Sequence, residues 1–307
     1  MPSVMSQKEI AAASAPVACL GGEVSTTNWQ WQNQSITVAY ETLGQGAPVL
    51  LLPAFSTVST RAELRALASD LAVHFRVTAL DWPGFGQSDR APLDYGPALY
   101  TQFLQDFVRS HFTTPVRLVA AGHAAGYALQ LAIQSPTSCD RLVLVAPTWR
   151  GPLAVMGLPA TLRQGVNTLV RSPLIGQALY GLNTQPSFLK WMYKRHVFVD
   201  EAKLTPAYIA ERHATTCQPG GRYAPAAFVT GGLDPVASRD AFLAWAQTVT
   251  VPLMVILAEQ APAKSKAEMT AISAHTSTPP VSLPGTLGLA EEYGSAVAAA
   301  LLPFLEH

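Results

Sequence analysis

The feature that most constrains the fold of this chain is a regular alternation of short apolar stretches with longer helical ones. Predicted strands cover residues 49–52, 77–80, 116–121, 141–145, 253–257 and 280–283. Predicted helices cover residues 60–73, 97–112, 124–134, 237–248, 264–274 and 290–305. Strands that are apolar throughout and alternate with helices are typical of a parallel sheet with helices on both faces. We therefore predict an α/β fold with a mostly parallel sheet.

The alternation is interrupted once, after Pro147. Residues 149–224 show no strand pattern, only helical pieces separated by glycine and proline, and we interpret them as a helical cap inserted into the core. Residues 29–40 alternate in polarity around a turn, which predicts an edge hairpin. The first residues are small and polar-leaning and are expected to be loosely ordered. The predicted division is a lead-in of residues 1–27, a core of residues 28–148 and 225–307, and the cap of residues 149–224.

Composition excludes several classes of protein. The chain has 307 residues, of which 49% are hydrophobic and 13% charged, and its formal net charge is zero. Without a basic excess, nucleic acid is not an expected partner. The three cysteines lie far apart and predict no disulfide framework. No apolar run reaches the ~18 residues of a membrane span, and the start lacks the pattern of a secretory signal, so we expect a cytoplasmic protein.

One motif lies between the strand at 116–121 and the helix at 124–134. It reads Gly122-His123-Ala124-Ala125-Gly126. Glycines in these positions suit a tight turn and close packing of helix on sheet. A strained turn of this kind can hold a nucleophile at the start of a helix. The methyl group of Ala124 cannot attack a carbonyl, so either the fold serves another purpose or the reactive group lies elsewhere.

Other motifs resemble those of the α/β-hydrolases, over residues 28–307. Residues 81–89 match the Asp-x-x-Gly-x-Gly-x-Ser turn of that family, and residues 51–56 stand where an apolar strand precedes its His-Gly-x loop. Residues 252–259 resemble the strand that leads to the acid of the catalytic triad. Through residues 52–57 and 122–125, the chain is also similar to a branch of the family from cyanobacteria and plastids that lacks the triad.

The resemblance implies that all three triad positions are altered. Ala124 takes the place of the nucleophile, Ala261 that of the acid and Leu287 that of the histidine. Residues 276–306 contain no histidine. An engineered serine-to-alanine knockout would retain its acid and histidine, so Ala124 is interpreted as part of a wider loss of serine catalysis.

The resemblance also places an oxyanion hole at the backbone N–H groups of Phe55 and Ala125, which need no particular side chain. Such a site can bind a carbonyl or an anion without a nucleophile. The predicted pocket has Ala124 as its floor. Its further lining residues are Ser56, His123, Trp149 and Asp234. No metal-binding pattern and no glycine-rich phosphate loop occur, so neither a metal nor a cofactor is expected.

The predicted cap has an unusual charge pattern. From Arg150 to Val199 there are six Lys or Arg residues and no Asp or Glu, among many apolar residues. A basic, apolar helical segment can lie on an anionic membrane surface. The preferred interpretation is nevertheless an ordinary cap whose apolar face covers the pocket.

Three hypotheses of function follow. In the first, the protein binds a small, largely apolar ligand with a carbonyl or acid group between cap and core. In the second, it docks through the basic cap on a partner protein or an anionic membrane surface. In the third, it is a weak or unconventional esterase. The sequence predicts no oligomeric state.

Overall fold

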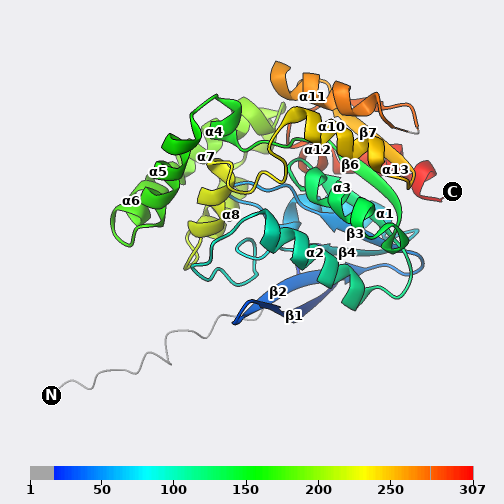
Figure 1. Ribbon diagram of the computed structural model, residues 1–307, viewed down its shortest axis with the longest axis horizontal. Coiled ribbons are helices and arrows are strands. Elements are labelled where there is room, and N and C mark those ends of the chain that lie inside the picture. The colour runs from blue at the N-terminus through cyan, green and yellow to red at the C-terminus, as the bar shows by residue number, and fades with distance from the viewer. Residues whose placement is uncertain (1–16, 277, 307) are drawn as a thin grey trace.

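The computed structural model describes residues 17–276 and 278–306, and its centre is an eight-stranded sheet in the order β1-β2-β4-β3-β5-β6-β7-β8 (Figure 1). The strands are β1 (Glu23–Trp31), β2 (Gln34–Leu43), β3 (Pro48–Leu52), β4 (Arg76–Leu80), β5 (Val116–Ala121), β6 (Cys139–Val145), β7 (Leu253–Ala258) and β8 (Val281–Leu283). The β1–β2 and β2–β4 pairs are antiparallel and all others are parallel. The predicted α/β fold with a mostly parallel sheet is confirmed.

Helices cover both faces of the sheet. The core helices are α1 (Arg65–Leu71), α2 (Pro97–His111), α3 (Ala124–Gln134), α10 (Arg239–Thr248), α11 (Ala263–Ser273), α12 (Leu289–Glu292) and α13 (Gly294–Glu306). Successive residues of a strand point to opposite faces. Leu50 and Leu52 therefore pack with α2, α3 and α10, whereas Val49 and Leu51 pack with α1, α12 and α13.

The chain before residue 28 is more ordered than the sequence predicted. Strand β1 begins at Glu23. The carboxylate of Glu41 accepts the backbone N–H groups of Cys19, Leu20 and Gly22 at 2.8–2.9 Å. The expectation of a loose lead-in over residues 1–27 is therefore wrong for residues 17–27, because a buried carboxylate fixes them, and its remainder, residues 1–16, lies outside the described residues.

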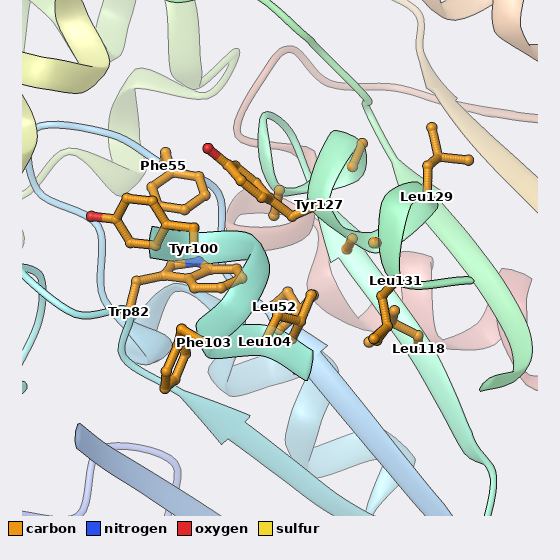
Figure 2. Close-up of a cluster of buried hydrophobic side chains, with 14 of the residues drawn as sticks. Leu52, Phe55, Trp82, Tyr100, Phe103, Leu104, Leu118, Tyr127, Leu129 and Leu131 are labelled. Carbon is orange, nitrogen blue, oxygen red and sulfur yellow. The ribbon is translucent and has the colours of Figure 1, made fainter. Parts of the chain in front are cut away.

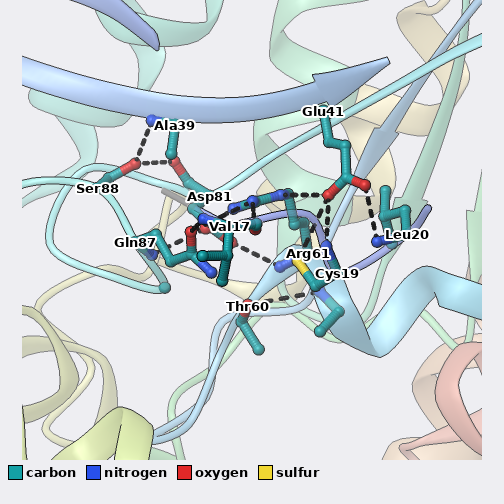
Figure 3. Close-up of polar contacts among 12 residues, drawn as sticks. Val17, Cys19, Leu20, Ala39, Glu41, Thr60, Arg61, Asp81, Gln87 and Ser88 are labelled. Atoms are coloured by element: carbon teal, nitrogen blue, oxygen red, sulfur yellow. Dashed lines mark hydrogen bonds and ion pairs between the residues drawn. The ribbon is translucent and has the colours of Figure 1, made fainter. Parts of the chain in front are cut away.

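The same carboxylate belongs to a buried ion cluster that also fixes the turn after β4 (Figure 3). Arg61 is completely buried and donates from Nε to Glu41 at 3.1 Å and from Nη1 to Asp81. Asp81 also accepts the N–H of Gln87 at 2.8 Å, and its carbonyl accepts the Ser88 hydroxyl. The turn at residues 81–89 therefore has a structural role, since the Asp81 carboxylate is bonded to Arg61 and Gln87.

The cap lies between β6 and β7, in a stretch that the structure describes throughout and that contains no strand. Its helices are α4 (Pro152–Val155), α5 (Ala160–Arg171), α6 (Ile175–Asn183), α7 (Pro186–Met192), the π-helical turn η3 (Tyr193–Val197), the 3₁₀ turn η4 (Glu201–Lys203), α8 (Pro206–Thr216) and α9 (Tyr223–Val229). Helices α5 and α6 form the end of the molecule farthest from the sheet (Figure 1). Of the described helices, none has the length and apolarity that crossing a membrane would need.

Candidate functional site

The elbow predicted at residues 122–126 has the expected backbone. Gly122 adopts a φ of +52° directly after β5, and a Cβ there would lie 2.9 Å from the Cβ of Ala54. The Gly122 N–H donates to Val145 of β6 at 2.9 Å, and helix α3 begins at Ala124. Only glycine adopts this left-handed backbone conformation readily and also leaves room for the side chain of Ala54. The sequence thus places Ala124 on a tight strand-to-helix turn at the carboxyl edge of the sheet.

Ala124 has no exposed surface, and the aromatic side chains that surround the elbow are packed against one another. The ring of Phe55 stacks on Trp82 at 4.8 Å and lies 5.5 Å from Tyr127 and 4.9 Å from Tyr100 (Figure 2). Their burial raises the pKa of Tyr100 and Tyr127 well above the usual value for a phenol. In this conformation Ala124 has no surface that a substrate carbonyl could reach.

The two predicted oxyanion donors are buried as well. Phe55 and Ala125 are 3% and 0% exposed. The Ala125 N–H already donates to the carbonyl of Gly122 at 3.2 Å, within the turn. In this conformation the Ala125 N–H is therefore not free to bind an anion.

His123 and Asp234, two of the predicted lining residues, are brought together across 111 positions of sequence. His123 Nε2 lies 3.0 Å from the carbonyl of Leu233 and 3.5 Å from Oδ1 of Asp234. Asp234 Oδ1 accepts the N–H of Gly151, at the start of the cap, at 2.7 Å. The contact therefore links the elbow, the segment before α10 and the cap.

Burial moves both ionisations. It lowers the pKa of His123 to about 4, although the hydrogen bond to Leu233 opposes the shift, and it raises the pKa of Asp234 to about 6. The imidazole is therefore neutral at pH 7, and its contact with Asp234 is a polar contact, not an ion pair. If Nε2 carries the proton that it shares with Leu233, then Nδ1 is an acceptor; it is buried without a partner among the described residues.

The other two predicted lining residues have local roles. The hydroxyl of Ser56 accepts the N–H of Val58 at 3.2 Å. Trp149 is nearly buried, lies 6.3 Å from the ring of Phe242, and carries the Arg150 guanidinium over its face at 5.1 Å. Neither residue contacts the His123–Asp234 pair in a described interaction.

Ala261 and Leu287, which the resemblance assigned to the acid and histidine positions, follow β7 and β8. Ala261 follows β7, is 8% exposed and donates its N–H to Ala258 at 3.2 Å. Leu287 follows β8 and packs on the apolar cluster around α12 and α13. Because β5, β7 and β8 are parallel, the three positions share the carboxyl edge of the sheet, and two carry methyl groups and one an isobutyl group.

The described cavities do not include the predicted pocket. The larger, about 400 Å³, lies on the cap between α7 and α8 and is lined by Leu204, Ile209, Lys190 and His213 among others. The crevice between cap and core, lined by Ser59, Gly86 and Tyr180 among others, has no room for a water molecule. Neither includes Ala124, Ala125 or Phe55. Among the described residues, no group of three or more His, Cys, Asp or Glu is placed to hold a metal ion.

Sequence reasoning missed a buried charged cluster between cap and core. Arg212 of α8 lies 3.1 Å from Glu291 of α12, which also accepts the hydroxyl of Tyr208. Glu63 caps the turn before α1 and accepts the Thr60 N–H at 3.2 Å. Burial raises the pKa of Glu63 well above its usual value, and the nearby Glu291 raises it further. Only the capping box of Thr60 and Glu63 had a sequence signal, because the other members are far apart in the chain.

Solved structures with the same fold include several hydrolases. An esterase from Thermogutta terrifontis is 21% identical, with a TM-score of 0.70 over 92% of this chain and 98% of that one. The enol-lactonase from Burkholderia xenovorans is 17% identical, with a TM-score of 0.69 over 89% and 97% of the two chains. A serine hydrolase involved in carbazole degradation is 18% identical, with a TM-score of 0.70 over 92% and 99%. At such identities the likeness concerns the fold.

Sequence comparison gives the family. A protein of Mycobacterium tuberculosis is 33% identical over 108 residues, which are 35% of this chain. The match spans 31% of that relative, so the chain covers about a third of its length. A sequence model of the alpha/beta hydrolase family, by contrast, matches residues 49–299. Because this match takes in most of the chain and the fold agrees with it, the chain belongs to the alpha/beta hydrolase family.

Proposed function

We propose that this protein performs no serine hydrolysis and acts by binding, on a fold that its relatives use for catalysis. The observation that carries the proposal is Ala124, which the resemblance places at the nucleophile position and which has no exposed surface. Hydrolysis by a serine mechanism needs a nucleophile, a base and a group that orients the base. Ala124, Leu287 and Ala261 supply none of these.

No nearby group takes over these roles. His123 is the imidazole closest to the elbow, but its Nε2 is engaged by the Leu233 carbonyl and the ring is buried. Triad residues act as a unit, and losing the set in a serine protease costs on the order of 10⁶ in kcat. An unconventional esterase would need the His123–Asp234 contact to open to water, and no described interaction favours that.

The ligand that we propose is small and largely apolar, with a carbonyl or acid group. Binding it between cap and core requires the segment before α10 to move away from α3. That segment is held by the hydroxyl of Tyr127, which donates to Leu233 at 2.7 Å, and by the contacts of His123 and Asp234. We therefore expect binding to be coupled to the opening of this segment.

Two assays on the purified chain test the proposal. Turnover of acetate, butyrate and octanoate p-nitrophenyl esters, a lactone and an epoxide should not exceed that of heat-denatured protein. Native mass spectrometry of freshly purified protein should show a bound small molecule, or one after addition of medium-chain fatty acids. Turnover that co-purifies with the chain and disappears in Ser59→Ala or His123→Gln would overturn the proposal. If native mass spectrometry shows no bound small molecule either before or after the fatty acids are added, the proposed binding of a small apolar ligand is refuted.

A further inference from the structure

Most of the large hydrophobic side chains that the structure leaves exposed belong to the cap. We define the outer cap surface by seven of them. These are Leu162, Val166 and Leu169 of α5, Leu174 and Ile175 at the start of α6, and Phe188 and Trp191 of α7. Leu174 is 85% exposed and Trp191 51%. Helices α5 and α6 pack against each other, and exposed apolar side chains gathered on neighbouring helices often mark an interaction site.

Helix α5 is oriented opposite to an ordinary surface helix. Leu162, Val166 and Leu169 follow the i, i+4, i+7 spacing of one helix face, and all three are exposed. Its charged side chains turn toward the protein: Arg163 donates from Nη1 to the Thr230 carbonyl at 2.7 Å. No residue of α5 is buried. An amphipathic helix normally buries its apolar face, so the exposed face of α5 is a candidate site for contact with a partner.

Helix α7 and the η3 turn add an exposed aromatic pair beside basic groups. The rings of Phe188 and Trp191 lie 5.6 Å apart, and the Arg195 guanidinium lies 5.9 Å from the centre of the Trp191 ring. Lys190 is exposed beside them, and Lys194 forms an exposed ion pair with Glu201 at 2.7 Å. Aromatic rings flanked by cations are characteristic of surfaces that insert into the boundary between lipid headgroups and acyl chains.

The charge of this region indicates the chemistry of the partner. No Asp or Glu occurs between residues 150 and 199. Arg163 and Arg171 are used internally, the second by the Leu93 carbonyl at 2.7 Å and by Asp94 at 3.0 Å. Lys190 and Arg195 therefore remain as exposed cations beside the apolar side chains. The complement of such a surface is apolar and negatively charged.

We propose that the outer cap surface rests on an anionic lipid bilayer. The Leu, Val, Phe and Trp side chains of that surface would enter the headgroup region, and Lys190 and Arg195 would contact lipid phosphates. A second copy of the chain fits less well, because in a twofold contact the partner presents the same surface, and residues 150–199 contain no Asp or Glu to pair with these cations. The inference goes beyond the proposed function, since it concerns neither turnover nor the cap–core ligand.

Sedimentation with vesicles tests this inference on the full chain. Vesicles of phosphatidylcholine alone are compared with vesicles in which one lipid in four is phosphatidylglycerol, at low and high salt. The apolar variant combines Leu162→Glu and Leu169→Glu, and its control is Val73→Glu, which is 79% exposed and lies in the core, directly after α1. The charge variant combines Lys190→Gln and Arg195→Gln, and its control is the exposed Arg76→Gln.

We expect binding to the anionic vesicles that weakens as salt rises, with both controls unaffected. Each cation that is neutralised should lower the partition coefficient about fivefold, and the apolar variant should abolish binding. Circular dichroism should show all variants folded, because every altered side chain is exposed. No binding to anionic vesicles, or binding that neither variant reduces, would overturn the inference. So would self-association that the apolar variant removes in the absence of vesicle binding.

Discussion

At the scale of single residues, His123 and Asp234 carry opposite pKa shifts within one contact. Burial lowers the pKa of His123 from 6.5 to about 4 and raises that of Asp234 from 3.8 to about 6. A lowered histidine pKa stabilises the fold above the unfolded value, and this contribution is lost as pH falls toward 4. A raised carboxyl pKa stabilises the fold at low pH, and this contribution is lost as pH rises toward 6. The two contributions oppose each other across the same pH range.

Replacing Asp234 with asparagine separates them. The variant keeps an oxygen that accepts the Gly151 N–H but removes the titration. The free energy of unfolding of the wild type, minus that of Asp234→Asn, should fall by about 3 kcal/mol between pH 3.8 and pH 6, since each pKa unit corresponds to about 1.4 kcal/mol. Urea unfolding at a series of pH values measures this difference.

His123→Gln provides the opposite control. The free energy of unfolding of the wild type, minus that of His123→Gln, should rise by about 3 kcal/mol between pH 4 and pH 6.5. In this range the unfolded imidazole binds a proton that the buried one does not. If the free energy of unfolding varied with pH in the same way in the wild type and both variants, neither His123 nor Asp234 would have a pKa shifted by burial.

Single positions differ in how far the sequence predicts them. The loss of the triad at Ala124, Ala261 and Leu287 stays a prediction, and it rests on the fact that each position follows a strand of the sheet. The packing of the Phe55 ring beside Tyr127 cannot be predicted from the sequence, because it depends on the rotamers of both side chains. The Arg212–Glu291 contact joins positions 79 apart, and no local pattern links them.

At the scale of elements, the first turn of α3 packs closely against Pro235, in the segment before α10. A Cβ on Gly126 would lie 2.3 Å from Cγ of Pro235. Alanine is normally better than glycine inside a helix by about 1 kcal/mol. Here we expect Gly126→Ala to destabilise the fold by ~1–3 kcal/mol, because the clash outweighs helix propensity.

Gly165 of α5 is the matched control. It lies inside a helix, and a Cβ added there meets nothing within 4 Å. Gly165→Ala should therefore stabilise the protein by ~0.5–1 kcal/mol. Thermal and urea unfolding of the two variants should shift in opposite directions; a shift in the same direction would contradict the packing of Pro235 on α3.

The sequence predicts most elements but not their breaks. The helix expected over residues 60–73 divides into a 3₁₀ turn and α1, where the Arg61 N–H donates to Asp81 at 2.6 Å. The helix expected over residues 290–305 divides before Gly294, where a Cβ would lie 2.8 Å from the Leu67 backbone nitrogen. Both breaks arise from tertiary contacts that periodicity does not contain. The exposure of the apolar face of α5 could not be predicted from the sequence either, because an amphipathic pattern does not say which face is buried.

At the scale of the whole molecule, a charged cluster connects the cap to the core. Arg212 comes from the cap helix α8, whereas Glu291 and Glu63 come from the core. Arg212 is the cation that faces both carboxyl groups. Removing one partner of a buried ion pair costs more than the pair contributes, because the other charge stays buried.

We therefore expect Arg212→Met to destabilise the protein by ~3–5 kcal/mol in urea unfolding. Glu291→Gln in the same chain should restore part of the loss, and a double-mutant cycle measures this coupling. Hydrogen exchange in α8 should accelerate in the single variant more than in α3. Additive effects of the two substitutions would contradict a direct interaction between cap and core at this cluster.

The measurement that tests the central claim most directly is ester hydrolysis by the wild type and by Ala124→Ser. Both proteins are assayed with p-nitrophenyl butyrate, and their intact masses are measured after incubation with a fluorophosphonate. Leu287 and Ala261 are assigned to the positions where a base and its partner would have to stand, and position 124 has no exposed surface. We predict no turnover above that of heat-denatured protein and no covalent adduct for either protein. Robust hydrolysis by Ala124→Ser, with one adduct per chain, would contradict the account.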